Sequence, residues 1–262
     1  MMFVDAHVHL SDEEYSGSAD DILAESRKAN VVALVSNSTD LKTCKGTLEL
    51  AGKHSGMVFA ALGIHPWTVR GLKEDELQRV LELISTQKGN RAFVAVGEIG
   101  LDSKYIEVWD EQMRVFDLML HSAEKLGLPA IIHSRGTTAQ IVDMLPSYKL
   151  KRVLLHWFSN PISALVKAVD RGYYITEGPP AAYSNDIRDV VKRVPLTNLL
   201  TETDGPVRFF KAPFEGKRTT PALIPTVIKA FAEVKEMGVE EVAGQILENF
   251  QDFFSLRLEG LN

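Results

Sequence analysis

The chain of 262 residues is long enough for one large domain or a single barrel with a substantial core. Its net charge of −6 provides no overall positive field, which argues against a protein that holds nucleic acid by bulk charge. Cys44 is the only cysteine, the first residues lack a basic signal segment, and no apolar run approaches the roughly 18 residues of a membrane span, so we expect a cytoplasmic protein without membrane contact.

Apolar runs of strand length alternate with stretches of helical periodicity along the chain. The strand-like runs cover residues 3–9, 31–37, 57–65, 92–100, 129–134, 152–157, 173–177 and 199–204. The helical stretches cover residues 20–29, 41–53, 74–86, 108–126, 138–145, 162–170, 185–194 and 222–237, and the tail 239–258 indicates one or two further helices. Eight such repeats in this length are typical of an α/β fold, the (β/α)8 TIM barrel, with a doubly wound open sheet as the alternative.

Most of the strand-like runs are nearly continuous in Val, Ile, Leu and Ala. This composition is expected of parallel strands that are buried on both faces. The chain contains no short-period repeat, no low-complexity segment and no linker rich in Pro, Gly and Ser. We therefore expect residues 1–262 to form a single domain.

Acidic and imidazole residues recur where the strand-like runs end. They occur in segments 5–9, 97–100, 132–134, 155–157 and 202–204, at the ends of the first, fourth, fifth, sixth and eighth runs. Active sites of TIM barrels lie at the C-terminal ends of the strands. The placement of these residues therefore favours the barrel over the open sheet and predicts that they lie close together.

The residue types at these positions are those that bind divalent metal ions. Residues two apart in a strand point to the same side, so His7 and His9 are placed to bind one ion together. Glu98 stands between glycines after an apolar run, where a carboxylate is costly unless it is paired or bound to metal. We interpret His54, in a polar loop, and His121, in a helical stretch, as ordinary polar residues. The candidate metal ligands are His7, His9, Glu98, His133, His156 and Asp204.

With these motifs the chain resembles the TatD family of metal-dependent deoxyribonucleases, within the wider amidohydrolase-like barrels. The resemblance runs nearly end to end, and the combination of motifs is highly specific although several of them alone are not. It is carried by segment 5–9, Gly-Ile-His-Pro at 63–66, Gly-Glu-Ile-Gly-Leu-Asp at 97–102, His-Ser-Arg at 133–135, His-Trp-Phe-Ser at 156–159, Glu-Thr-Asp at 202–204 and Gly-Lys-Arg at 216–218.

The resemblance implies a site for two divalent metal ions. One ion is expected to be bound by His7, His9 and Asp204, the second by His133 and His156, and both by a bridging Glu98. Two such ions stabilise the attacking and leaving oxygens of a phosphodiester displacement and activate a water as the nucleophile. Glu98 and Asp204 are therefore candidate catalytic residues, and Asp204 is expected to orient the water or accept its proton. Nitrogen and oxygen ligands suit zinc, manganese or magnesium, and the sequence leaves the metal open.

Four further residues are candidates for substrate binding: His65, Arg135, Lys217 and Arg218. His65 is expected to contact a phosphate, the alternative being a structural role in the loop. Arg135 either clamps a phosphate bidentately or pairs with a neighbouring carboxylate. Segment 208–218 carries four basic residues against one acidic, and this net +3 either steers a polyanion or belongs to a solvated loop in which Arg218 is structural. The three phenylalanines of that segment either stack on bases or pack over the barrel end.

The chain departs from the family pattern at substrate-facing positions and at none of the expected ligands. It has Trp67, Ser103, Trp157 and Thr219-Thr220 where the family commonly has His, an aromatic residue, Cys and Asn-Glu. We expect a DNase or exonuclease of TatD type that acts on DNA or another phosphate-containing substrate. The alternatives are a related metallohydrolase that cleaves an ester or amide, such as a D-aminoacyl-tRNA ester, and a non-catalytic metal-holding protein. The sequence leaves the oligomeric state open.

Overall fold

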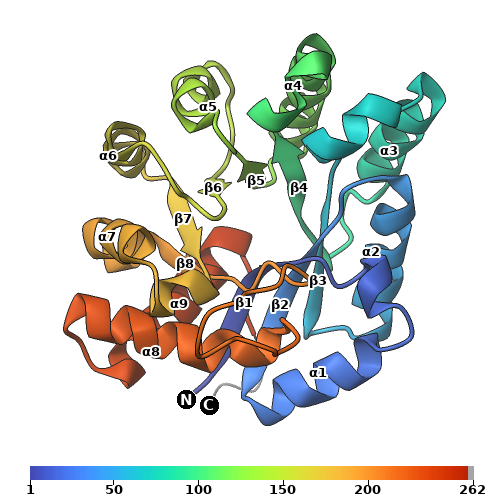
Figure 1. Cartoon of the computed structure of the whole chain (residues 1–262). Helices are drawn as coiled ribbons and strands as arrows, with labels where there is room; N and C mark the ends of the chain where they lie inside the picture. The colour runs from blue at the N-terminus through green and yellow to red at the C-terminus, as the bar shows by residue number, and fades with distance from the viewer. Residues whose placement is uncertain (259–262) are drawn as a thin grey trace.

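The computed structural model describes residues 1–258 and confirms the predicted (β/α)8 barrel (Figure 1). Within that range, eight strands follow one another around the barrel in chain order, and each successive pair is parallel. The strands are β1 (Phe3–Val8), β2 (Val31–Asn37), β3 (Val58–Leu62), β4 (Phe93–Gly100), β5 (Ala130–His133), β6 (Val153–Leu155), β7 (Tyr174–Glu177) and β8 (Leu199–Thr201).

The helices form an outer ring around these strands (Figure 1). They are α1 (Ala19–Lys28), α2 (Leu41–Lys53), α3 (Glu74–Thr86), α4 (Trp109–Leu126), α5 (Thr138–Met144), α6 (Ile162–Asp170), α7 (Asn185–Arg193), α8 (Ile224–Lys235) and α9 (Val239–Phe254). The last of these shows that the tail predicted as one or two helices forms one. The stretch predicted as helical at 222–237 begins later, because Pro221–Leu223 form a 3-10 turn and Pro225 occupies the first turn of α8.

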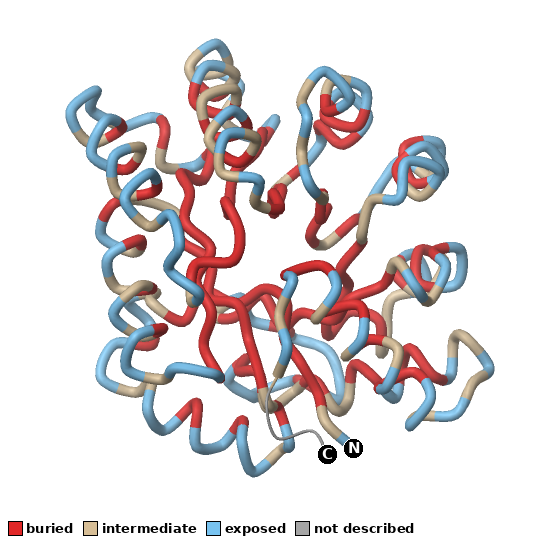
Figure 2. Tube along the Cα trace, turned by 180° about the vertical axis from the view of Figure 1, so that it is seen from behind, coloured by how far each residue is buried: buried red, intermediate tan, exposed pale blue. Residues whose placement is uncertain are grey.

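The strands are buried on both faces, as their continuous apolar sequences predict. Every residue of β1, β3 and β4 is buried, and in β2 only Val32 is partly accessible. Figure 2 shows this contrast between the buried centre and the exposed outer sides of the helices. The apolar residues of strands and helices belong to one continuous hydrophobic core.

The last strand returns to the first and closes the barrel. The Thr201 hydroxyl donates to the Val4 carbonyl at 2.8 Å, and the Asp204 amide donates to the His7 carbonyl at 2.9 Å. These contacts exclude the open sheet, in which the first and last of the eight strands would not meet. They also bring the residue that follows β8 next to the end of β1.

Glycine is required where β4 passes β5. Gly100 has a φ of 150°, and a Cβ added there would lie 2.0 Å from the carbonyl oxygen of His133. Such a distance is far below van der Waals contact, so only glycine fits without moving the backbone. The close approach sets the position of Glu98 relative to His133, the residue that ends β5.

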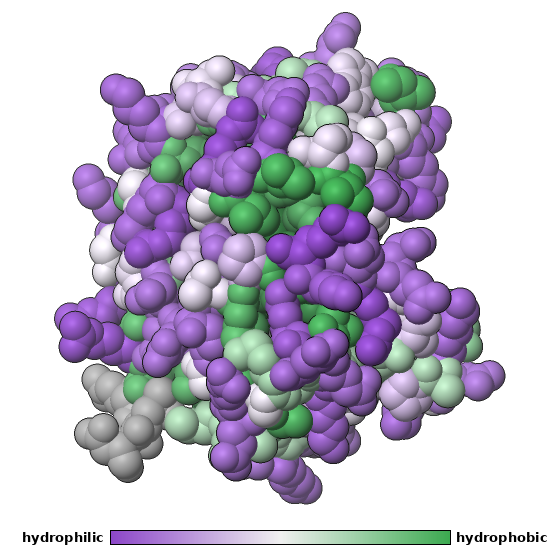
Figure 3. Space-filling model, turned by 90° about the vertical axis from the view of Figure 1, so that its left-hand side faces the viewer, coloured by the Kyte–Doolittle hydropathy of each residue, from purple (hydrophilic) through white to green (hydrophobic). Residues whose placement is uncertain are grey.

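The surface has a mixed polar and apolar character. In Figure 3, apolar atoms gather in the middle of the face that is shown, among mainly hydrophilic side chains. Among the described residues, none of the helices combines the length and the apolar character that crossing a membrane requires.

Candidate metal centre

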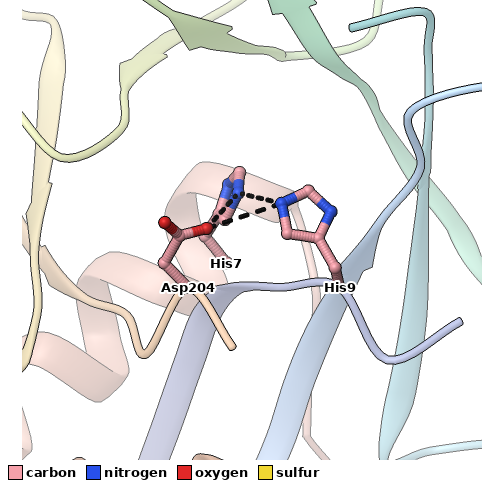
Figure 4. A group of neighbouring side chains, drawn as sticks. All are labelled: His7, His9 and Asp204. Carbon is pink, nitrogen blue, oxygen red and sulfur yellow. Dashed lines mark hydrogen bonds and ion pairs between the residues drawn. The ribbon is translucent and has the colours of Figure 1, made fainter. Parts of the chain in front are cut away.

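Two histidines and an aspartate meet where the first and last strands end (Figure 4). His7 belongs to β1, His9 lies just after it, and Asp204 lies just beyond β8. The Nε2 atoms of His7 and His9 are 3.2 Å apart, and the Oδ1 atom of Asp204 lies 3.4 Å from the first and 3.5 Å from the second. All three side chains are buried and point toward one another. This is the grouping that the sequence predicted for one metal ion.

The orientation of His9 is fixed by a contact on its far side. Its Nδ1 atom lies 3.1 Å from the carbonyl oxygen of Asn37 at the end of β2. A carbonyl oxygen only accepts hydrogen bonds, so Nδ1 carries a proton, and Nε2 is the ring nitrogen that faces His7 and Asp204. A backbone carbonyl on the second nitrogen is a common way to orient a metal-binding histidine.

Glu98 lies at the middle of the site with its two oxygens in different surroundings. Its Oε2 atom is 3.3 Å from His7 Nε2 and 3.2 Å from His9 Nε2. Its Oε1 atom is 3.0 Å from His133 Nδ1 and 2.8 Å from His156 Nε2. One carboxylate therefore joins the two histidines at the end of β1 to the two histidines at the ends of β5 and β6.

His65 also contacts Glu98, and its protonation follows from its other partner. The Trp67 amide donates to His65 Nδ1 at 3.1 Å, so the proton of the ring is on Nε2, which lies 3.2 Å from Glu98 Oε1. Burial lowers the pKa of His65 to about 4, which keeps the ring neutral. The structure thus places His65 as a hydrogen-bond donor to Glu98, and the phosphate contact expected for it stays a prediction.

Asp102 is the last residue of the Gly-Glu-Ile-Gly-Leu-Asp motif at 97–102, and the sequence predicted no role for it. Its Oδ2 atom lies 3.1 Å from Nε2 of His133, whose Nδ1 faces Glu98. Burial lowers the pKa of His133, but Asp102 and Glu98 outweigh that effect and raise it. Asp102 therefore holds the His133 ring in place. The signal in the sequence was a second carboxylate soon after Glu98, at the same end of the barrel.

A second group of carboxylates lies behind His156. Glu202 Oε2 lies 3.4 Å from His156 Nδ1 and accepts a hydrogen bond of 2.5 Å from the Thr176 hydroxyl. Glu177, the last residue of β7, is fully buried, and neither of its carboxylate oxygens has a hydrogen-bond partner among the described residues. Burial, and then the charge of Glu202, raise the pKa of Glu177 well above 4.5. Glu177 was not among the predicted site residues, although it ends the seventh strand-like run.

The electrostatics of the centre favour added positive charge. Burial lowers the pKa of His9, but Asp204 and Glu98 outweigh it and raise the pKa to about 10. Burial also lowers the pKa of His156, yet Glu98 and Glu202 outweigh it and raise the pKa well above 6.5. Burial alone would raise the pKa of Glu98, whereas the surrounding imidazoles lower it well below 4.5. Protons on the histidines supply this positive charge when no other cation supplies it.

The donor atoms fit metal ions. Neutral imidazoles cannot direct two lone pairs at each other without repulsion, and a shared cation removes that repulsion. There are three overlapping sets of potential ligands, and within each set the donor atoms lie within 4.8 Å of one another. The sets are His7 with His9 and Asp204, His7 with Glu98 and His156, and His65 with Glu98 and His133. The six predicted ligands are all present in these sets.

A cavity of about 730 Å³ opens onto this cluster. Arg135, predicted to bind substrate, lines the cavity and is exposed, and Arg208 from the segment after Asp204 lines it too. Asp12 and Glu14 bring acidic groups to the same cavity. The remaining lining residues are His9, His65, Trp67, Glu98, His133, Ser134, His156, Trp157, Ser159, Asp204, Pro206 and Val207.

Lys217 and Arg218 are not among the residues that line this cavity. Arg218 donates to the Glu14 carbonyl at 2.6 Å and to the Ser18 hydroxyl at 2.9 Å, and its guanidinium lies 4.9 Å from the Tyr15 ring centre. These contacts tie the segment after Asp204 to the loop that follows β1. The substrate-binding role of Lys217 and Arg218 stays a prediction, and Arg208 is the basic residue of this segment that reaches the cavity.

The fold and the site define a metal-dependent hydrolase: a parallel (β/α)8 barrel gathers five histidines and several carboxylates at the C-terminal ends of its strands. A family model described as TatD related DNase matches residues 4–255. The chain therefore belongs to the TatD family, as its motifs predicted.

Relatives cover the chain almost completely. YabD of Bacillus subtilis (strain 168), named an uncharacterized metal-dependent hydrolase, is 30% identical over 264 residues, which cover 97% of this chain and 100% of YabD. A human protein named deoxyribonuclease TATDN3 is 31% identical over 264 residues, 96% of this chain and 94% of the relative. The crystal structure of YjjV, a TatD homolog from Escherichia coli K12, matches with a TM-score of 0.90 at 28% identity, covering 97% of this chain and 98% of that one.

Proposed function

We propose that the protein is a nuclease that hydrolyses phosphodiester bonds in DNA with the help of two divalent ions. The observation that carries the proposal is the position of Glu98, whose Oε2 atom faces His7 and His9 while Oε1 faces His133 and His156. A carboxylate placed in this way is suited to bridge two ions. The name of the family and that of the human relative support DNA as the substrate.

The residues divide into two sets around Glu98. One ion would be held by His7, His9 and Asp204, and the other by His133 and His156. Bound zinc, manganese or magnesium would supply a lowered water pKa and a counter-charge for the phosphodiester oxygens. Asp204 lines the cavity from the β8 side, and four other proposed ligands, His9, Glu98, His133 and His156, line it too.

The side chains have separate tasks in this reaction. Asp204 orients the attacking water through its carboxylate and accepts the proton that the water loses. Arg135 and Arg208 donate hydrogen bonds to phosphate oxygens at the cavity wall. His65 donates from Nε2 to Glu98 Oε1 and so orients the bridging carboxylate.

Lys217 and Arg218 lie farther from the reacting atoms. Their charge acts on the approach of the polyanion, together with the net +3 of segment 208–218. Acidic Glu14 pairs with Arg208 at 3.1 Å in the free protein. A phosphate that enters the cavity competes with Glu14 for this guanidinium.

The test starts from protein stripped of metal with EDTA. Single-stranded DNA, duplex DNA and aminoacylated tRNA are incubated with it before and after manganese, zinc or magnesium is restored. We expect DNA cleavage only after a divalent ion is restored, with about two ions bound per chain by elemental analysis. Cleavage of the aminoacyl ester without cleavage of DNA would replace the proposed substrate, and DNA cleavage in excess EDTA would reject metal dependence.

Asp204→Asn separates ion binding from proton transfer. The substitution keeps the size of the side chain and removes its charge and basicity, while the four histidine ligands and Glu98 remain. Loss of a positioned base typically lowers kcat about 10²–10⁴-fold, and we expect this at saturating manganese with the fold retained. His121→Asn, on the exposed side of α4, is the matched control and should leave kcat unchanged. Wild-type kcat in a folded Asp204→Asn protein would remove Asp204 from the mechanism.

A further inference from the structure

The cavity has an apolar wall that the hydrolysis of a phosphodiester does not require. Trp67, Trp157, Pro206 and Val207 line it beside the histidines. Phosphate and metal need charged or polar partners, so they do not account for this apolar wall. The two tryptophans offer the largest flat apolar surfaces of the group.

Trp67 stands directly beside the metal centre with its indole open to solvent. It is 46% exposed, which is unusual for so large an apolar side chain. The centre of its ring system lies 4.0 Å from that of His65 and 6.4 Å from that of His9. Its amide donates to His65 Nδ1 within the 3-10 turn Pro66–Gly71, so the residue is anchored by its backbone. Trp67 therefore offers a fixed, accessible indole within one nucleotide of the metal centre.

Trp157 brings a second indole to the same cavity, in a backbone conformation that disfavours side chains. Its φ is 40°, in the left-handed region that glycine adopts most readily. Its amide donates to the Thr176 hydroxyl at 3.3 Å, and its ring lies 5.8 Å from that of Phe209. Backbone strain of this kind is concentrated at functional sites. A tryptophan in this conformation next to the proposed ligand His156 indicates use of its side chain.

The phenylalanines after Asp204 do not provide an equivalent surface. Phe209 and Phe214 are buried, as expected if they pack over the barrel end. Phe210 is 79% exposed but is not among the residues that line the cavity. Stacking on the substrate at the metal centre therefore falls to the tryptophans.

We propose that Trp67 and Trp157 form a stacking subsite for an unpaired nucleobase of the nucleotide whose phosphate occupies the metal centre. The inference rests on the proposed nuclease function and adds the two residues that would bind the base. Indole faces stack on any base, so the subsite needs no particular sequence. Bases inside a duplex are stacked on their neighbours and are not free to enter it. Arg135 and Arg208 in the same cavity provide the charge complementary to the attached phosphates.

The test compares two strands that differ only in their bases. One is single-stranded oligothymidylate, and the other is a strand of equal length built from abasic tetrahydrofuran residues, with every phosphate retained. The value of kcat/KM is measured with manganese for the wild type and for Trp67→Ala. Loss of one stacking contact typically costs about 5- to 150-fold, so we expect Trp67→Ala to lower kcat/KM by that factor on oligothymidylate and hardly at all on the abasic strand.

Trp157 provides a second variant with a conservative counterpart. Trp157→Gly relieves the left-handed backbone but also removes the packing of the indole against the core and Phe209, so we expect a lower melting temperature, and the assays are run well below it on folded protein. It should lose the preference for oligothymidylate, whereas Trp157→Phe should keep most of it. Trp109→Phe is the control, because Trp109 packs against the core at the start of α4 and is not among the cavity residues. The chain has three tryptophans in all.

The outcomes distinguish the subsite from the nuclease. A wild-type enzyme that cleaves both strands with equal kcat/KM would overturn the subsite and leave the nuclease proposal standing. Equal losses on both strands in Trp67→Ala would also overturn it, because the residue would then act only on the metal centre. A metal-loaded wild type that cleaves neither strand would reject the nuclease, and the subsite with it. Quenching of tryptophan fluorescence by oligothymidylate in Trp109→Phe, but not by the abasic strand, supports stacking without turnover.

Discussion

Glu98 brings five imidazoles into contact with one carboxylate. His7, His9, His65, His133 and His156 all lie within 3.3 Å of its oxygens. A buried carboxylate without partners would be protonated or would destabilise the fold. The surrounding nitrogens instead keep the pKa of Glu98 well below 4.5, although burial acts in the opposite direction. The charge that defines the site is thus maintained by the same residues that are proposed to bind the ions.

Glu177 presents the opposite situation, a buried carboxylate that nothing described in the structure satisfies. An unsatisfied buried polar group costs about 1–3 kcal/mol. We expect Glu177→Met, an apolar side chain of similar length, to increase the free energy of unfolding at pH 7 by about that amount. Glu177→Gln is the control, since it removes the charge but keeps unpartnered polar atoms and should gain less. Urea unfolding gives the free energy of unfolding of the wild type and the two variants. A Glu177→Met protein less stable than the wild type would contradict the prediction.

The same residue predicts a pH dependence of stability. Its pKa is raised in the folded state above the ordinary value of 4.5, so folding takes up a proton at any pH between the two values. The wild type should therefore lose stability as the pH rises above 4.5 towards the folded pKa. Both Glu177 variants lack this contribution, so their unfolding free energy should fall less over that range. Parallel pH curves for wild type and variants would show that Glu177 has its usual pKa.

Strands and helices differ in whether they tolerate the replacement of a glycine by alanine. An alanine at Gly100 would place its Cβ 2.0 Å from the His133 carbonyl, on a backbone with φ of 150°. Strain and overpacking of this kind cost about 2–5 kcal/mol together, and β4 or β5 must shift to accommodate it. We expect Gly100→Ala to lower the free energy of unfolding by that amount and to displace His133.

Gly52 in α2 is the matched control for Gly100. No heavy atom lies within 4 Å of an added Cβ there, and the residue is helical. Alanine in a helix is favoured over glycine by about 0.5–1 kcal/mol, so Gly52→Ala should be neutral or stabilising. Urea unfolding of both variants decides the matter. A Gly100→Ala protein as stable as Gly52→Ala would mean that the β4–β5 contact is looser than described.

The sequence predicted the strands and the six ligand candidates because both follow local rules. Buried parallel strands read as apolar runs, and ligands on them recur at the same end. Element ends were less predictable: β8 ends at Thr201 and β3 at Leu62, so Asp204 and His65 lie on the loops beyond. Those ends depend on where the neighbouring strand stops pairing, which no local pattern encodes.

Contacts between distant segments account for what the sequence did not predict. The roles of Asp102 and Glu202 depend on which histidine each one faces across the barrel. Arg208 and Arg218 belong to one basic segment, yet one lines the cavity and the other binds the backbone beside Tyr15. The two arginines carry the same charge in the same segment, so only the path of the folded chain determines which of them reaches the cavity.

For the whole molecule, the core and the metal centre are separate sources of stability. The apolar core joins strands and helices around the barrel and includes none of the proposed ligands. Ions that bind only the folded state add about 4 kcal/mol each at a thousand times their dissociation constant, which corresponds to a melting temperature higher by roughly 10 °C for a chain of this size. We expect EDTA to lower the melting temperature by that order and to leave the circular dichroism spectrum at 25 °C unchanged.

The control for chelation is the restoration of manganese. The melting temperature should return and should rise further with metal concentration, because the effect follows mass action. Loss of the helical signal in EDTA at 25 °C would show that the barrel itself depends on the ions. A melting temperature indifferent to both treatments would argue that the cluster binds no metal.

The contact between the last strand and the first has a consequence for how the protein is made. Thr201 and Val4 are 197 residues apart in the sequence, and His7 and His9, at the end of β1, meet Asp204 only across this junction. During synthesis His7 and His9 emerge from the ribosome long before Asp204. Contacts of such large separation also form late in folding. A growing chain therefore carries an incomplete centre until the segment after β8 has emerged, and we expect hydrolytic activity only once the chain has closed on itself.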